Sequence, residues 1–344
     1  MHDRYFVSIK RSRPEFLSDN RHGRFYAFTV KTFAFVVAVA AIAVNSSLAG
    51  QYQPEGDFFH PTASIVWQAT NELPKSLTVF KVSPHISEAA ISNAMAIGSF
   101  KPLNKIHSAN GDNLIVFQDH QDKGQMTRYL KIFPPTGWLN YYDARAEGGS
   151  PRNVPSFDEV ERLATNYLSR LGGDLRQLAP KPWMRSEQTV TTFTKNGGEE
   201  TGKAVSMRGV FLYRQIDGIP EPESKFWINF VNDAKPSVFE MKWKPLSPIS
   251  RYEVASTNEI LSWILAGKAV RPTLIYGNTG NEDVGAAKKF TITAISPYLG
   301  TARGTKDIVS PFGKIEITAE FSPTNTIQFF LNCPILSTNT TNTK

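Results

Sequence analysis

A β-hairpin is predicted by the stretch GVFLYRQIDGIPEPESKFWINF, residues 209–230. Two segments rich in aromatic and β-branched residues flank the pair Asp217-Gly218, and this pair favours a tight turn. Glu221 and Glu223 follow the turn, each next to a proline. Paired carboxylates serve acid–base chemistry only where burial or crowding separates their pKa values. A proline-rich connection offers little burial, so we expect a solvated turn and not a catalytic loop.

Upstream of this hairpin, the sequence predicts a capped amphipathic helix within residues 155–173. Ser156 and Glu159 have the spacing of a capping box, in which each side chain accepts a hydrogen bond from a backbone amide at the helix start. Gly172 and Gly173 allow the left-handed exit at the other end. The apolar residues form a single stripe along this helix, made of Val160, Leu163, Ala164, Tyr167, Leu168 and Leu171.

Two further segments repeat this pattern more weakly. Ser256 and Glu259 form a second capping box before the apolar run ILSWIL. In residues 82–100, Ser83 can cap a helix with Pro84 at its first position. Each predicted helix is followed by several segments with the alternation of a β-strand, so one helix accompanies a group of strands three times along the chain.

Each strand is predicted to be exposed to solvent on one face and buried on the other. In SVFEMKWK, residues 237–244, Phe239, Met241 and Trp243 alternate with charged residues. Strands joined by tight turns pair antiparallel, because parallel pairing needs a long crossover after each strand. The predicted fold class is therefore α+β, with tandem units that each pack an amphipathic helix on an antiparallel β-sheet.

Proline-bearing joints suggest where one unit ends and the next begins. We expect a leader followed by three α+β units and a flexible tail. Their predicted bounds are residues 1–49 for the leader, 50–150, 151–248 and 249–336 for the units, and 337–344 for the tail.

The first 49 residues have the order of a secretory signal peptide. Seven basic and three acidic side chains precede the uncharged apolar run of residues 32–44. Ser47 and Ala49 then have the spacing that signal peptidase prefers, which favours cleavage after Ala49. A membrane-spanning helix needs about 20 apolar residues, and this run is shorter. The long basic stretch keeps a second interpretation open, in which residues 32–49 stay as an anchor. Both interpretations predict an exported protein, periplasmic or extracellular.

Charge argues against a nucleic-acid-binding protein. The chain of 344 residues has a net charge of +7, and more than half of this excess lies in the leader. Phosphate binding requires a dense basic face, which the remaining diffuse charge does not supply. With 41% hydrophobic residues, the chain can fill several cores.

Few residues have the pattern of a catalytic site. The last histidine is His120, and the sequence has no zinc-protease, Cys-x-x-Cys, nucleophile-elbow or P-loop motif. Asp119, His120 and Asp122 lie together and could bind a metal or orient a base. Neighbouring residues of a strand point to opposite faces, so we expect a polar hairpin turn there. Cys333 is the only cysteine, and its apolar surroundings predict a small buried side chain. We expect no cofactor and no metal.

The six tryptophans raise the question of a binding surface. Trp243 and Trp263 lie on apolar stripes and are expected in cores. Trp227 shares a strand face with Asn229, opposite the apolar residues around it, so it can lie on an outer surface. Together with Trp138, these two residues form the candidate interaction surface. The alternatives for these indoles are packing in a core or between domains, which is favoured, and a sugar-stacking platform.

Residues 150–336 resemble a group of bacterial extracytoplasmic proteins, the YycH/YycI and PepSY-like regulators. The segment GVFLYRQIDGIPEPESKFWINF is similar to their strand–GIP-turn–strand element, and YEVASTNEILSWILAG is similar to their Ser-capped helix after an aromatic strand. The resemblance implies a non-enzymatic regulator outside the cytoplasm that binds other proteins. One departure is that those regulators usually keep an uncleaved anchor helix, whereas this leader looks cleavable. No functional residue is carried over.

These observations predict an exported protein that acts through protein–protein contact, without a cofactor and without catalysis. Two alternatives stay open. The first is an envelope hydrolase with a site between units, which would use Asp119, His120 or the pair Glu221 and Glu223. The second is a carbohydrate- or cell-wall-binding module, which rests on the tryptophans. The sequence indicates neither the partner nor the oligomeric state.

Overall fold

The computed structural model describes ten stretches of the chain, which form two compact units. The first unit holds the described residues within Met1–His22, Ser83–Gly218 and Ser224–Pro245. The second holds those within Gly23–Val82, Ile219–Glu223 and Leu246–Lys344. The described stretches are residues 7–11, 63–83, 86–102, 105–107, 114–120, 126–146, 150–193, 200–269, 286–301 and 307–337.

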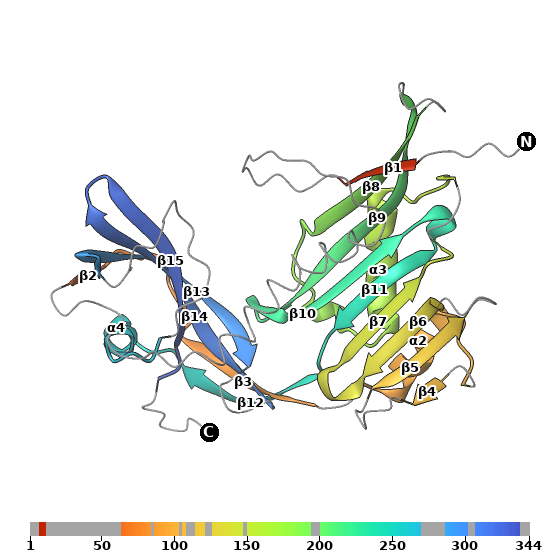
Figure 1. Ribbon diagram of the computed structural model, residues 1–344. Coiled ribbons are helices and arrows are strands. Elements are labelled where there is room, and N and C mark those ends of the chain that lie inside the picture. Colours follow the sequence, from red (N-terminus) through yellow and green to blue (C-terminus); the bar gives the residue numbers. More distant parts are fainter. Residues whose placement is uncertain are drawn as a thin grey trace, which may run out of the picture. The chain divides into compact units, whose positions relative to one another are not determined.

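A single sheet of nine described strands forms the body of the first unit (Figure 1). Its strand order is β1-β8-β9-β10-β11-β7-β6-β5-β4, and each register given for neighbouring strands is antiparallel. The strands are β1 (Val7–Arg11), β4 (Lys105–His107), β5 (Ile115–His120), β6 (Met126–Phe133), β7 (Trp138–Asp143), β8 (Met184–Phe193), β9 (Glu200–Ile216), β10 (Ile219–Phe230) and β11 (Pro236–Lys242).

Two helices, α2 (Glu88–Ile97) and α3 (Phe157–Arg170), pack on one face of this sheet. Ala94 of α2 and Ala164 of α3 are fully buried in the same core as Phe226 and Phe239 of the sheet. Because a strand turns alternate side chains to opposite faces, the residues between these buried ones lie on the other face. Both described helices of this unit are thus on one side. Short 3-10 helices connect other elements of the unit at η2 (Pro134–Thr136), η3 (Leu175–Gln177) and η4 (Asn232–Ala234).

The helix predicted within residues 155–173 is confirmed, with Ser156 as its N-cap and with its exit, and one of the two hydrogen bonds of the predicted capping box is present. The Ser156 hydroxyl accepts a hydrogen bond from the Glu159 amide at 3.3 Å, and Gly172 has a φ of 91°. The start predicted for the upstream helix is wrong. Ser87, not Ser83, caps α2, since the Ser87 hydroxyl accepts a hydrogen bond from the Ala90 amide at 3.1 Å. Ser83 directly follows β3 (Ser76–Val82), and its amide donates to the Pro245 carbonyl oxygen. The helix therefore begins four residues later than the Ser-Pro pair suggests.

The second unit is built on a second sheet, with strand order β12-β3-β14-β13-β2 and β15 paired to β14. Its pairs are antiparallel with one exception, since β2 and β13 run parallel. The described helix of this unit begins with the complete capping box of Ser256 and Glu259, as predicted. The elements are β2 (Ser64–Trp67), β3 (Ser76–Val82), β12 (Leu246–Glu253), α4 (Thr257–Leu265), β13 (Lys289–Thr301), β14 (Ile308–Ser322) and β15 (Asn325–Pro334).

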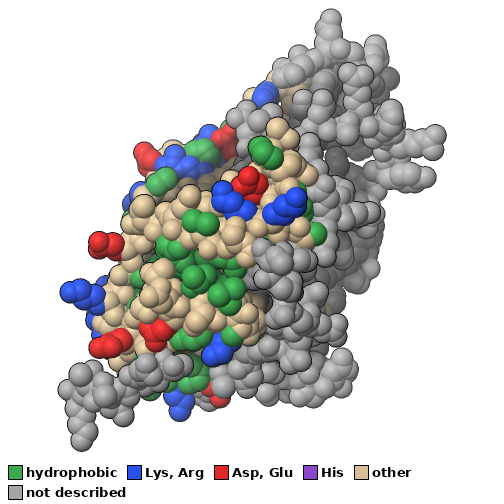
Figure 2. All heavy atoms as spheres, turned by 90° about the vertical axis from the view of Figure 1, so that its left-hand side faces the viewer, with side chains coloured by type: hydrophobic (Ala, Val, Ile, Leu, Met, Phe, Trp, Pro, Cys, Tyr) green, Lys and Arg blue, Asp and Glu red, His purple; other side chains and the backbone are tan. Residues whose placement is uncertain are grey.

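Alternation along β14 and β15 builds the core of the second unit. Ile315, Ile317 and Ala319 are buried, and Phe290 of β13 meets Phe329 of β15 edge-on at 6.3 Å between ring centroids. Trp263 of α4 is buried too, as the sequence predicted. Figure 2 looks onto this unit, where hydrophobic side chains gather in a central band and most charged side chains lie toward the margins.

The predicted fold class of tandem helix-on-sheet units is wrong, because two large sheets dominate the structure. Strands from both sides of the boundary predicted at residues 150–151 share the first sheet, which carries two helices. The pairing of β11 with β7 joins them. Likewise β3, which the prediction assigned to the first unit, pairs with β12 in the second sheet. The helices cover parts of two continuous sheets instead of defining separate units.

The hairpin predicted from Asp217-Gly218 is confirmed. Their φ values of 51° and 81° are both positive, as a two-residue turn of type I′ requires. The expectation that the following carboxylates are solvated is wrong for Glu221, which is only 3% exposed. β10 begins immediately after the turn at Ile219, so the prolines lie within a strand and not in a loop.

Part of the predicted leader lies in the structure. Residues 7–11 form β1, an edge strand of the first sheet, whereas the apolar run of residues 32–44 and the predicted cleavage position lie outside the described residues. Among the described residues, no helix has the length and apolar character needed to cross a membrane.

Candidate interaction surface on the first sheet

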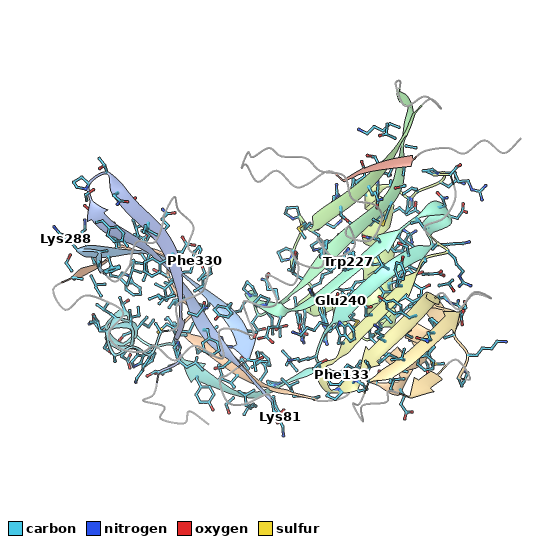
Figure 3. The ribbon with its side chains drawn as sticks, in the orientation of Figure 1. Lys81, Phe133, Trp227, Glu240, Lys288 and Phe330 are labelled. Carbon is cyan, nitrogen blue, oxygen red and sulfur yellow. The ribbon has the colours of Figure 1, made fainter. Side chains whose placement is uncertain are left out.

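Aromatic side chains lie on the face of the first sheet that is turned away from α2 and α3. We call this surface the helix-free face, because neither described helix of the unit packs on it, and define it by Tyr129 and Phe133 of β6, Trp138 and Tyr142 of β7, and Trp227 of β10. The strand register pairs four of them, since Trp138 is opposite Phe133 and Tyr142 is opposite Tyr129. Trp227 lies opposite Glu240, and β11 separates it from β7. All five are half-buried. Figure 3 labels Trp227 and Phe133 on these strands, with Glu240 of β11.

Trp227 is held rigidly at one side of the helix-free face. Its ring stacks on Phe211 of β9, with 5.6 Å between centroids and 11° between planes. The indole Nε1 donates a hydrogen bond to Asn229 Oδ1 at 3.1 Å. This contact leaves the indole with little rotational freedom, so a partner that packs on it loses little conformational entropy.

Asn229 positions Trp227 and is itself only 4% exposed. Its Oδ1 also accepts a hydrogen bond from the Ser186 hydroxyl at 3.5 Å. The amide side chain lies directly over Gly209 of β9, where a Cβ atom would come within 1.8 Å of Oδ1. The candidate surface predicted from Trp227, Asn229 and Trp138 is thus divided: the two indoles lie on the helix-free face, and Asn229 lies buried beneath it.

Charged residues of both signs lie between the aromatic rings. Lys225 Nζ is 3.7 Å from a carboxylate oxygen of Glu240, which is opposite Trp227 in the register. Lys131 Nζ lies 4.7 Å from the centroid of Tyr129. Burial raises the pKa of the Tyr129 hydroxyl, and the nearby charge of Glu240 raises this pKa further. The surface is therefore mixed, with neither one sign of charge nor a purely apolar character.

Sequence reasoning found the two indoles and missed the other aromatic residues. Tyr129, Phe133 and Tyr142 lie in segments that were recognised as strands, RYLKIF and WLNYYDA. The alternation in these segments indicates which positions face the core. These positions are all buried: Leu130, Ile132, Leu139 and Tyr141. Assigning the remaining positions to a common face would have identified the aromatic surface, but it also required knowledge of the strand order.

The acidic cluster considered as a catalytic or metal site has a structural explanation in its described part. Asp119 lies in β5 and forms an ion pair with Arg128 of β6. Arg128 in turn lies 4.6 Å from the centroid of Phe100. The side chain of His120 and residue Asp122 lie outside the described part. No group of three or more potential metal ligands occurs among the residues that the structure describes.

The second candidate pair, Glu221 and Glu223, lies in β10 and not in a flexible loop. The carboxylate of Glu223 accepts hydrogen bonds from the Thr301 hydroxyl at 2.9 Å and from the Thr301 amide at 3.3 Å. These contacts fix Glu223 in the second unit, where burial raises the pKa of the Tyr298 hydroxyl and the charge of Glu223 adds to this effect. Its contacts give Glu223 a structural role.

Cys333 is buried, and its predicted character as a small hydrophobe is confirmed. Burial raises the pKa of its thiol to about 12. The reactive species of a cysteine is the thiolate, which is scarce at neutral pH with this pKa.

A buried carboxylate on α3 forms the clearest charged cluster of the first unit. Glu161 is 3% exposed and is bound by Lys181 and by Arg185, whose Nη2 lies 2.7 Å from Oε1. Burial raises the pKa of Glu161, but the hydrogen bonds from Lys181 and Arg185 outweigh burial and hold this pKa below its usual value. Lys181 lies just before β8 and Arg185 lies within it, so the cluster connects α3 to the start of β8.

We expect Glu161→Gln to weaken the acid dependence of stability. A lowered folded-state pKa stabilises the fold above the unfolded pKa of about 4.3, and this stabilisation is lost as the pH falls through the folded value. The free energy of unfolding, measured by urea titration at pH 7, 5 and 3, should therefore fall less steeply in Glu161→Gln than in the unchanged protein. Glu253→Gln, at an exposed position, is the matched control and should keep the original dependence. Identical profiles for both variants would contradict the role of Glu161.

Comparisons with known proteins indicate neither a family nor a function for this chain. No family model and none of the curated proteins matches the sequence. Among solved structures, the chain is similar to the crystal structure of an uncharacterized protein from Eubacterium rectale ATCC 33656, with a TM-score of 0.38 and 12% sequence identity. The likeness covers 78% of this chain and 86% of that one. A likeness this distant carries no argument about function, and the resemblance to YycH/YycI and PepSY-like proteins stays a prediction. Nothing in the described residues or in these comparisons indicates catalysis.

Proposed function

We propose that the protein is exported and acts without catalysis, by binding another protein through the helix-free face of its first sheet. The observation that carries this proposal is the group of five half-buried aromatic side chains on that face. Aromatic residues are enriched in protein–protein interfaces, where they supply a large contact area at a low cost in conformational entropy. The rigid stacking of Trp227 on Phe211 supports this role.

The distribution of charge also supports a protein partner. Glu240 and Lys225 lie beside Trp227, and Lys131 lies beside Tyr129. Polar and charged groups beside aromatic anchors supply hydrogen bonds and charge complementarity in protein interfaces. A nucleic-acid partner would instead require many unpaired basic groups on one face. A hydrolase is supported less, because Asp119 and Glu223 have structural partners. A carbohydrate ligand, which stacks on exposed indoles, is the alternative that the experiment must separate.

Export is proposed from the leader sequence. Protein recovered from the periplasmic, envelope and culture-supernatant fractions should begin at Gly50, the residue after the predicted cleavage position. N-terminal sequencing of the protein from each fraction identifies its first residue. Recovery of the intact chain from the envelope would support the anchor, and recovery of the intact chain from the cytoplasm alone would contradict export.

Trp227→Ala is expected to reduce capture of the partner from an envelope fraction by about thirtyfold, because truncation of an aromatic anchor in an interface costs about 2 kcal/mol of binding free energy. Trp138→Ala should weaken capture of the same protein. Leu175→Ala removes an exposed hydrophobic residue outside the helix-free face and is the control. Capture is measured with immobilised protein and quantitative mass spectrometry, after thermal unfolding has shown that each variant is folded.

Two outcomes would contradict the proposal. The first is equal capture by Trp227→Ala and the unchanged protein, since the face would then not be the binding surface. The second is binding on a glycan array that Trp227→Ala abolishes, since the ligand would then be a carbohydrate.

A further inference from the structure

The edge of the first sheet is occupied by a strand from the predicted leader. β1 pairs antiparallel with β8 over five residues, from Val7 opposite Thr192 to Arg11 opposite Gln188. These residues precede the apolar run of residues 32–44. During export, the basic segment before such a run stays on the cytoplasmic side, whether the run is then cleaved off or kept as an anchor. In an exported protein β1 therefore cannot pair with β8, and β8 becomes the edge.

The edge that β1 leaves has few of the usual protections against strand pairing. Residues 188–192 read Gln-Thr-Val-Thr-Thr, with no charge, no proline and no glycine. Natural edge strands are commonly protected by lysine, by proline or by a bulge. The register of β8 with β9 does shift between Gln188 and Thr189 and again between Thr192 and Phe193, yet the pairing of β1 with residues 188–192 has no shift. The β-branched residues also favour the extended conformation.

We propose that residues 188–192 of β8 form a strand-addition site for an extended segment of a partner protein, and that β1 occupies this site before export. The inference rests on the proposed function, because export is what vacates the edge. The bound strand indicates the chemistry of the partner segment. It is extended and antiparallel, with β-branched residues at alternate positions as at Val7 and Ile9, followed by basic residues opposite Thr189 and Gln188. Backbone hydrogen bonds would supply the affinity, as in other cases of strand addition.

A peptide of residues 5–13 is the probe. It should bind the exported form and slow the amide hydrogen exchange of residues 188–192, measured by mass spectrometry. The control peptide carries Ser8→Pro and Ile9→Pro together. Consecutive N–H groups of a strand point to opposite sides, so one of these two prolines removes a donor that faces β8, and we expect no protection.

Introducing a charged residue at Thr189 of β8 tests the register of the bound peptide. Lys10 is directly opposite Thr189. Thr189→Lys places like charges opposite each other and should weaken peptide binding about two- to fivefold, whereas Thr189→Glu should strengthen it by a similar factor. A general loss of structure would not give effects of opposite sign. Peptide affinity is measured by fluorescence polarisation.

The outcomes separate this inference from the proposed function. If export fails, the isolated protein still begins at Met1 and keeps β1. In that case Ser8→Pro and Ile9→Pro are introduced into the full chain to displace β1 from β8. The same peptide should then bind to the free edge of β8. Absence of peptide binding in both forms would overturn the strand-addition site. Protection of residues 188–192 that increases with protein concentration, together with a dimer in sedimentation, would overturn the partner segment in favour of a second copy of this chain.

Discussion

Replacing Phe239 with alanine is expected to lower the free energy of unfolding by about 3–5 kcal/mol, because this truncation removes a large buried ring and leaves a cavity. Phe239 is fully buried in β11, which lies between β10 and β7 in the middle of the first sheet. Its ring stacks on Tyr141 at 5.0 Å between centroids and lies 6.3 Å from Phe226. The neighbouring strands fix these rings, so the structure has little freedom to collapse into the space.

Phe133→Ala is the matched control for this substitution. Phe133 lies in the same sheet, on the helix-free face, and is only half-buried. Its removal should cost clearly less than that of Phe239, since less apolar surface returns to water. Chemical denaturation of both variants, followed by circular dichroism, gives the two values. If both substitutions lowered the free energy of unfolding by the same amount, the core would not lie between the sheet and its helices.

The local elements could be predicted from the sequence because local patterns determine them. The cap at Ser156 and the stripe of α3 are properties of one short segment, and so is the turn at Asp217-Gly218. The grouping of strands could not be predicted in this way. β11 pairs with β7, which lies almost one hundred residues earlier, and no local pattern specifies that partner. The same applies to the parallel pairing of β2 with β13.

The candidate surface, too, could be predicted only in part, because the exposure of its residues depends on which strands are neighbours. Alternation along β10 correctly placed Trp227 on the side opposite Phe226 and Ile228. Whether a residue on that side is accessible depends on the neighbouring strand. Asn229 is buried because Gly209 of β9 leaves room for its side chain. Such contacts between strands follow from the register, which the sequence pattern leaves open.

No sequence pattern singles out Arg214. Arg214→Met is expected to lower the free energy of unfolding by about 3 kcal/mol, as is typical for the loss of buried hydrogen bonds to a charged group. Arg214 lies in β9 and is only 3% exposed. Its Nη1 donates to the Lys244 carbonyl oxygen at 2.6 Å, and its Nε donates to Gln177 Oε1 at 2.9 Å. The guanidinium carbon lies 5.4 Å from the centroid of Trp243.

The cost arises because methionine fills much of the same volume but donates no hydrogen bond. The oxygens of Gln177 and Lys244 would then lose their charged donor. Arg214→Lys keeps the charge without the planar fork of donors, so an intermediate loss of stability is expected. Arg251→Met is the control, since Arg251 is exposed and binds Ser76 at the surface, where such contacts contribute at most about 1 kcal/mol. The order Arg214→Met, Arg214→Lys, Arg251→Met, from largest loss to smallest, is measured by urea denaturation at neutral pH. An Arg214→Met variant as stable as the unchanged protein would mean that apolar packing fully replaces the hydrogen-bonded guanidinium, as happens at some buried ionic sites.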